Sequence, residues 1–346
     1  MHALVLMRLI KIRKMPIFEP RTYFMMASIF VPQKIGLLLA CLMALFGSKV
    51  CGQPLPDSKE TLAIESSKFS VETPAQQNML GGHLQGIQLH NETLLVAGSS
   101  KEFGYLGLFQ KLGDGFRFLG LKKLATEPLN HAGGFQIAEN WLAIGLEDAV
   151  GKRQSIVQLI DVSSFEKLQS PPAYTLRRKG EYQFSTAGAV ALLMREEHFL
   201  LAVGTWDCRT IDFYVSNGLN PYSEDFAFEK WTTWDSREAI RRKWSDKKFG
   251  SYQNLQLTQD TSGVYITGFC RAANGSNRAD VYQMNTDADP YTMMQKVASY
   301  SVQCNGDVTF RNGGGFATYD GKPSIIAVGH GLSPEMQFQI FPIKGK

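Results

Sequence analysis

The stretch "HLQGIQLHNETLLVAG", His83–Gly98, returns along the chain as "HAGGFQIAENWLAIG", His131–Gly145. Each stretch holds an alternating apolar segment, a short polar turn and a second apolar segment that ends in glycine. Such alternation is typical of β-strands, and a short polar turn between two of them predicts a hairpin. A unit that recurs along a chain indicates a fold built by stacking its copies.

The pattern recurs three more times, at Ser185–Gly204, Ser251–Gly268 and Gly313–Gly329. Two further strand-like segments follow each of the first four copies, such as "YLGLFQKL" and "FRFLGLKKL" after the first. Four strands in about 60 residues, repeated five times, are typical of propeller blades. We predict an all-β fold, a five-bladed β-propeller with four-stranded antiparallel blades. The five hairpins end at Gly98, Gly145, Gly204, Gly268 and Gly329.

The last copy is one strand short. Only "MQFQIFPIK", from Met336, follows it, whereas "SKFSVET", Ser67–Thr73, precedes the first copy as an extra strand. We predict that this N-terminal strand completes the last blade, because an open ring would leave strand edges exposed. The predicted domains are a leader over 1–52, a linker over 53–66 and one propeller over 67–346, with a helical insertion at about 234–249.

The leader predicts export. Lys34 precedes an apolar run over Ile35–Phe46, which is short for a membrane span but fits a secretory signal. The long segment before Met25 indicates a true start at Met25 or Met26 as an alternative to Met1. We predict a secreted or periplasmic protein, which would contact a membrane only if the leader stays uncleaved.

The charge of the chain does not predict a nucleic-acid partner. The net charge is +4, but residues 1–52 hold seven basic residues and one acidic residue. The remainder holds 29 basic residues (36 − 7) and 31 acidic ones (32 − 1), so it is slightly acidic. A nucleic-acid role therefore loses its electrostatic support. We expect a monomer.

The run "HAGGFQIAENWLAIG…SIVQLIDVSS", from His131, resembles repeats of secreted bacterial five-bladed propellers, with a strand-opening histidine and an "IDVS" third strand. The resemblance implies the fold but no specific enzyme family. Propellers of this kind include lectins, glycoside hydrolases, nucleotidases and interaction modules, so function depends on the site residues.

One face of the propeller is expected to carry the site. The loops that lead into the innermost strands and those that join second to third strands open on the same face, here called the mouth face. Our leading hypothesis is an exported, non-enzymatic propeller that binds a small-molecule, glycan or protein ligand there. The predicted binding residues are His83, His131, Glu147, Asp148, Trp206, Asp207, Arg209, Arg271 and His330.

A hydrolase acting on glycosides is the alternative, with Asp148 and Asp207 as the working carboxylates. Resemblance to five-bladed glycoside hydrolases implies an Asp early in the first inner strand, where this chain has His83 and Gln88 instead. A structural interpretation is that these carboxylates pair with arginines of neighbouring loops.

A metal-dependent enzyme is the third hypothesis. His83, His131 and His330 fall on neighbouring blades and could bind a divalent metal with Glu147 or Asp148 as an acidic helper. The structural interpretation is that the repeated histidines bind neighbouring backbone. No other cofactor is predicted.

The insertion "TWDSREAIRRKWSDKKFG" predicts a short helix over Ser236–Trp244, because Asp235 and Glu238 form a capping pattern. Its arginines and lysines, with the tryptophans around it, fit either a cationic lid over the mouth face or a solvated helix whose tryptophans fill a gap between blades.

Three cysteines follow the leader, so at most one internal disulfide is expected. Cys270–Cys304 and Cys208–Cys270 are the two candidate pairs, and the sequence does not choose between them.

Overall fold

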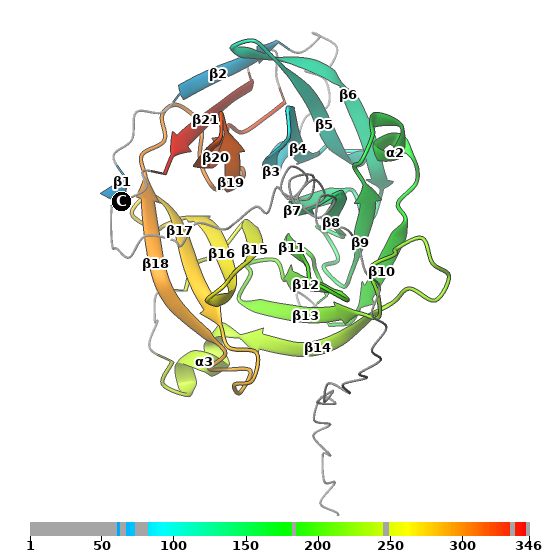
Figure 1. Cartoon of the computed structure of the whole chain (residues 1–346), viewed down its shortest axis with the longest axis vertical. Helices are drawn as coiled ribbons and strands as arrows, with labels where there is room; N and C mark the ends of the chain where they lie inside the picture. Colours follow the sequence, from blue (N-terminus) through cyan, green and yellow to red (C-terminus); the bar gives the residue numbers. More distant parts are fainter. Residues whose placement is uncertain are drawn as a thin grey trace, which may run out of the picture. The chain divides into compact units, whose positions relative to one another are not determined.

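The computed structural model describes residues 61–62, 67–72, 82–181, 185–244, 249–332 and 336–343, all within one compact unit, Gly52–Lys346. Its described strands form five antiparallel blades around a common axis, with the first strand of each repeat innermost (Figure 1). The predicted five-bladed propeller is therefore confirmed. The predicted leader lies outside the described residues, and none of the helices described is long and apolar enough to cross a membrane.

Four blades are built from consecutive strands, and the last takes its outer strand from the N-terminal side. Blade 1 holds β3 (His83–His90), β4 (Thr93–Ser99), β5 (Phe103–Leu112) and β6 (Gly115–Thr126). Blade 2 holds β7 (His131–Ala138), β8 (Trp141–Glu147), β9 (Gln154–Asp161) and β10 (Tyr174–Lys179), with α2 (Phe165–Gln169) after β9. Blade 3 holds β11 (Ala189–Met194), β12 (Phe199–Gly204), β13 (Thr210–Ser216) and β14 (Phe228–Asp235), followed by α3 (Ser236–Arg241). Blade 4 holds β15 (Asn254–Asp260), β16 (Gly263–Arg271), β17 (Asn277–Met284) and β18 (Met294–Val302). Blade 5 holds β19 (Gly314–Tyr319), β20 (Lys322–Val328), β21 (Met336–Pro342) and β2 (Ser67–Glu72).

The ring is closed by β2, as predicted. β2 pairs antiparallel with β21, placing Phe69 opposite Phe338, and in parallel with β6, placing Val71 opposite Phe116. Blades 5 and 1 therefore form one continuous sheet. One pairing was not predicted: β1 (Thr61–Leu62), inside the expected linker, pairs in parallel with β18 and adds a strand to blade 4.

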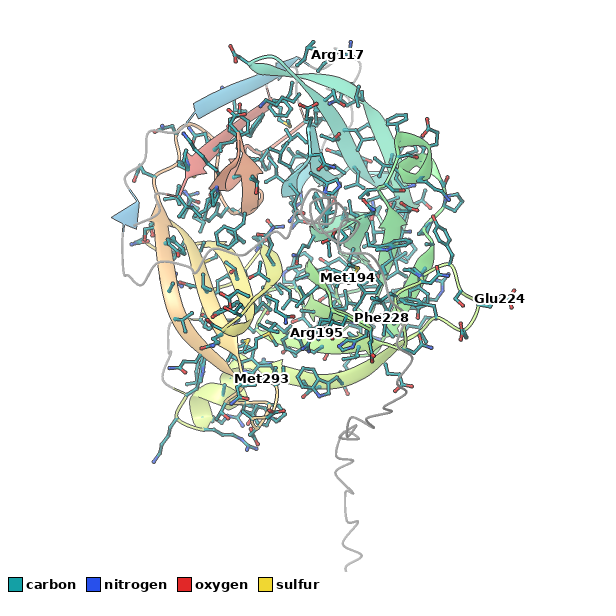
Figure 2. The ribbon with its side chains drawn as sticks, in the orientation of Figure 1. Arg117, Met194, Arg195, Glu224, Phe228 and Met293 are labelled. Carbon is teal, nitrogen blue, oxygen red and sulfur yellow. The ribbon has the colours of Figure 1, made fainter. Side chains whose placement is uncertain are left out.

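The core lies between the blades. Successive residues of a strand point to opposite faces, and a neighbouring blade covers each face. In β4, Leu94 and Val96 pack toward blade 5, whereas Leu95 and Ala97 pack toward blade 2. Among the described residues, one hydrophobic cluster occupies each of the five junctions between blades. Figure 2 shows side chains filling these spaces, with the exposed Arg117 at the outer edge.

Glutamines at equivalent positions of the first two repeats tie the innermost strands together. The Oε1 atom of Gln88 accepts a hydrogen bond from the backbone N–H of Ile137, at 2.8 Å. The Oε1 atom of Gln136 accepts from the backbone N–H groups of Leu192 and Leu257, at 3.0 and 2.8 Å. The repetition in the sequence therefore reflects bonds between blades near the axis.

The lid interpretation of α3 is wrong. Asp235 caps the helix as predicted, but α3 ends at Arg241 and lies at the outer edge beside β14 and β18, away from the axis (Figure 1). Trp234 and Trp244 are 0% and 6% exposed and pack in the junction between blades 3 and 4. Met293, near α3 in Figure 2, is buried in the same cluster. These tryptophans fill a gap between blades and cannot stack on a ligand.

The cysteines of the described part of the chain are all free thiols. Cys270 is buried between blades 3 and 4, whereas Cys304 packs in the junction between blades 4 and 5. The candidate Cys270–Cys304 disulfide is therefore absent, because the two side chains lie in different clusters. Cys208 shares the cluster of Cys270, but this second candidate pair is not bonded either.

Candidate functional site

Four aromatic rings meet on the mouth face. His330 follows β20, His83 and His131 open β3 and β7, and Trp206 follows β12. The ring centroid of His83 lies 5.2 Å from that of His131 and 6.2 Å from that of His330. The rings of His131 and Trp206 stack at 5.6 Å. These four residues, here called the histidine–tryptophan cluster, come from four different blades.

Glu147 holds the ring of His131 in place. Its carboxylate is 1% exposed; Oε1 lies 3.1 Å from Nδ1 of His131, and Oε2 accepts the backbone N–H of Ala187 at 2.7 Å. A carboxylate only accepts, so the Nδ1 hydrogen of His131 points to Glu147 and the orientation of the ring is set. Glu147 thus orients the cluster and joins blade 2 to the segment that leads into blade 3.

Asp148 shapes the turn that carries Lys152. Its Oδ1 accepts the backbone N–H groups of Val150 and Gly151, at 3.1 and 2.6 Å, and its carbonyl accepts that of Lys152. The turn places the ammonium of Lys152 3.6 Å from the centroid of the Trp206 ring, a cation–π contact. Lys152 was not among the predicted site residues.

His83 is a neutral imidazole at pH 7. Burial, followed by the neighbouring His131, His330 and Arg311, lowers the pKa of His83 from 6.5 to about 4. A neutral imidazole presents one hydrogen-bond donor and one acceptor. The cluster therefore combines the neutral imidazole of His83 with the aromatic ring of Trp206, and the ammonium group of Lys152 lies against that ring.

We expect the His83 ring to titrate with a midpoint of about pH 4 in an NMR titration of the imidazole C–H signals. The unfolded chain titrates near 6.5, so the stability associated with neutral His83 is present above pH 6.5 and is lost as the pH falls toward 4. His83→Gln should flatten this part of the stability profile in urea unfolding between pH 7 and 4. A midpoint near 6.5 would contradict the partial burial of His83 beside His131, His330 and Arg311.

The two predicted catalytic carboxylates are engaged separately. Asp148 is used by its own turn, and Asp207 pairs with Arg209, Oδ2 to Nε, at 3.0 Å. Both members of this pair are more than two-fifths exposed, so the pair contributes little stability. Within the described residues, no contact joins Asp148 to Asp207. Asp207 and Arg209 belong to the same loop, so this pair is not the predicted pairing between neighbouring loops.

The metal hypothesis has no geometric support: no three His, Cys, Asp or Glu side chains in the described ranges are grouped so that they could hold a metal ion. The rings of His83 and His330 stack at 10°, so their in-plane lone pairs do not converge, and His131 already uses Nδ1 on Glu147. Arg271, at the exposed end of β16, makes no described contact with the cluster.

Sequence reasoning missed Lys152 and Arg311 because both lie outside the repeated pattern. Lys152 follows the Asp148 turn by four residues, and a turn-forming Asp before Gly151 was the available signal. Arg311 lies just before the last repeat, where no periodic pattern marks it.

Neither the family models nor the curated proteins match this chain. Among solved structures, the chain is similar to a bifunctional GH43-CE protein of Bacteroides eggerthii, with 12% identity and a TM-score of 0.48 over 81% of this chain. The chain spans only 35% of that protein. It is also similar to the catalytic domain of a Coprinopsis cinerea GH62 α-L-arabinofuranosidase (6% identity, TM-score 0.46, 82% of this chain and 98% of that chain). A GH43_1 enzyme from Xanthomonas citri complexed with xylotriose is a further similar structure (9% identity, TM-score 0.44, 78% and 89%). At such identities the likeness concerns the fold alone.

Proposed function

We propose that this protein binds a small polar ligand of the glycan class at the histidine–tryptophan cluster. The observation that carries the proposal is the meeting of four rings from four blades on one face, with His83 held neutral. Sugar rings offer apolar C–H faces and many hydroxyl groups. Aromatic side chains pack against the C–H faces of a sugar. Neutral imidazoles can donate hydrogen bonds to its hydroxyl groups and accept hydrogen bonds from them.

The accessibility of the cluster supports a ligand rather than only a scaffold. His330 is exposed, and His83 and Trp206 are partly exposed. Glu147 and Asp148 hold His131 and Lys152 in place, so the cluster is preorganised by bonds that a ligand need not replace. Side chains that are already held in place lose less conformational entropy when a ligand binds.

Glycoside hydrolysis is the second candidate, supported by the partly exposed carboxylate of Asp207 next to Trp206. Hydrolysis needs a second carboxylate across the scissile bond. Asp148 could act as this second carboxylate only if it gave up its hydrogen bonds to the backbone of its own turn. Binding without cleavage is therefore the function that we favour.

We expect Trp206→Ala to weaken glycan binding at least tenfold, or about 1.4 kcal/mol, because it removes the largest ring of the cluster. Binding is measured on a glycan array that contains xylotriose, followed by calorimetry with the best binder. Trp141→Ala is the matched control, because Trp141 is a partly exposed tryptophan at the opposite end of blade 2. If both variants bind equally, or if no glycan binds, the proposal fails.

The same incubations separate binding from hydrolysis. Chromatography of the glycan after prolonged incubation should show intact ligand. Release of a reducing sugar that is lost in Asp207→Asn would assign the site to hydrolysis instead.

A further inference from the structure

A concave site lies between blades 1 and 2 on the face opposite to the mouth. It is a cleft of about 440 Å³, bounded by the β3–β4 turn, the ends of β5 and β6, and α2. Ligand pockets commonly measure roughly 300–1,000 Å³, so this cleft has the size of a small-molecule site. None of the predicted or proposed mouth-face residues lines it.

The floor of the cleft is apolar and fixed. Leu95, Leu108 and Leu168 line it, and all three are buried in the hydrophobic cluster between the two blades. Above them, Leu119 and Phe165 also line the cleft but remain 36% and 48% exposed. Large apolar side chains left open beside a preformed hollow favour a ligand with an apolar body.

The polar side chains of the lining, here called the polar wall, carry no charge. They are those of His90, Asn91, Thr93, Gln110, Ser163 and Ser164, and the lining includes no Asp, Glu, Lys or Arg. Burial lowers the pKa of His90, so this imidazole is neutral at pH 7. In the described part of the chain, no side-chain hydrogen bond of Asn91 or Thr93 is found. The hydroxyl of Ser163 donates to the carboxylate of Asp161.

We propose that this cleft binds an uncharged amphipathic small molecule, with an aromatic or alicyclic body and a hydroxyl or amide group at one end. A charged ligand would lose hydration without gaining a counter-charge from the lining. A purely apolar ligand would cover the polar wall without satisfying its hydrogen-bonding groups. The ligand that satisfies both walls is neutral and has one polar end.

The experiment is a fluorescence titration of the full chain with 2-naphthol at pH 7, a neutral probe with an aromatic body and one hydroxyl group at one end. We expect a saturable rise in emission, and we expect Leu119→Lys and Phe165→Asp each to weaken binding at least tenfold. Both side chains are already exposed, and an acidic residue suits the first turn of α2, so both variants should keep their melting temperature. Leu112→Lys is the matched control, since Leu112 is 63% exposed on blade 1 but does not line the cleft.

Three outcomes would overturn the proposal. The first is no saturable rise with the wild-type chain. The second is equal weakening by Leu119→Lys and Leu112→Lys, which would place the probe elsewhere on blade 1. The third is a concentration-dependent dimer in sedimentation that Leu119→Lys abolishes, which would assign the cleft to contact between copies of the chain.

Discussion

Gly145→Ala should lower the free energy of unfolding by about 3 kcal/mol or more, the upper range for overpacking a core. A Cβ atom at this position would lie 2.1 Å from the carbonyl oxygen of Ala187. That oxygen belongs to the backbone that leads into blade 3, and the N–H of Ala187 is held by Glu147. The neighbour therefore cannot move aside without breaking the link between blades 2 and 3. Urea unfolding followed by tryptophan fluorescence measures the change.

Gly218→Ala is the control for the loss of a glycine. Nothing lies within 4 Å of the Cβ position at Gly218, and its backbone is not in the left-handed region. This variant should stay within about 0.5 kcal/mol of the wild type. If Gly145→Ala proves as stable as Gly218→Ala, the close approach of the two blades at Ala187 is wrong.

The five glycines that end the repeated hairpins explain why the fold was predictable from the sequence. Every one of them faces a side chain or backbone segment that leaves no room for a Cβ atom, so the same constraint recurs once per blade. Since the constraint and the alternating apolar pattern both repeat, five copies were enough to predict five blades and the closing strand. The groups that face these glycines are the Tyr105 ring at Gly98, Ala187 at Gly145, Cys208 at Gly204, the Tyr252 ring at Gly268 and Asp307 at Gly329.

The candidate site was predictable only in part, because its geometry depends on features that do not repeat. The histidines could be placed on one face, since His83 and His131 open strands at equivalent positions and His330 directly follows Gly329, which ends the last hairpin. The roles of Glu147 and Asp148 could not be assigned, because a buried orienting carboxylate and a turn-forming one look alike in sequence. The sequence could not choose between the two interpretations of the insertion for a related reason: composition does not distinguish a gap between blades from a ligand site. Trp234 and Trp244 fill the gap.

Blade 4 contains a fully buried carboxylate, that of Asp280. The Oδ2 atom of Asp280 accepts hydrogen bonds from Tyr252 Oη at 2.7 Å and Arg278 Nε at 2.8 Å, with Lys296 Nζ at 3.3 Å. Its Oδ1 atom accepts from Ser299 Oγ at 2.7 Å. Burial, and then the charge of Asp280, raises the pKa of Tyr252 well above 10, so the phenol remains a donor. One carboxylate thus satisfies donors from β17, β18 and the segment that leads into β15.

Asp280→Ala should lower the free energy of unfolding by about 3–5 kcal/mol, because it leaves Arg278 and Lys296 without the carboxylate that offsets their desolvation. Asp280→Asn should cost less, since the amide oxygen still accepts one or two of these hydrogen bonds. Glu238→Ala is the control for removing an acid from an ion pair: Glu238 and Arg241 are 36% and 74% exposed, and the expected cost is below about 1 kcal/mol. Urea unfolding of all three variants at pH 7 measures these differences. Equal costs for Asp280→Ala and Glu238→Ala would show that the network around Asp280 is open to water, and that blade 4 does not depend on a buried charge to hold its outer strands.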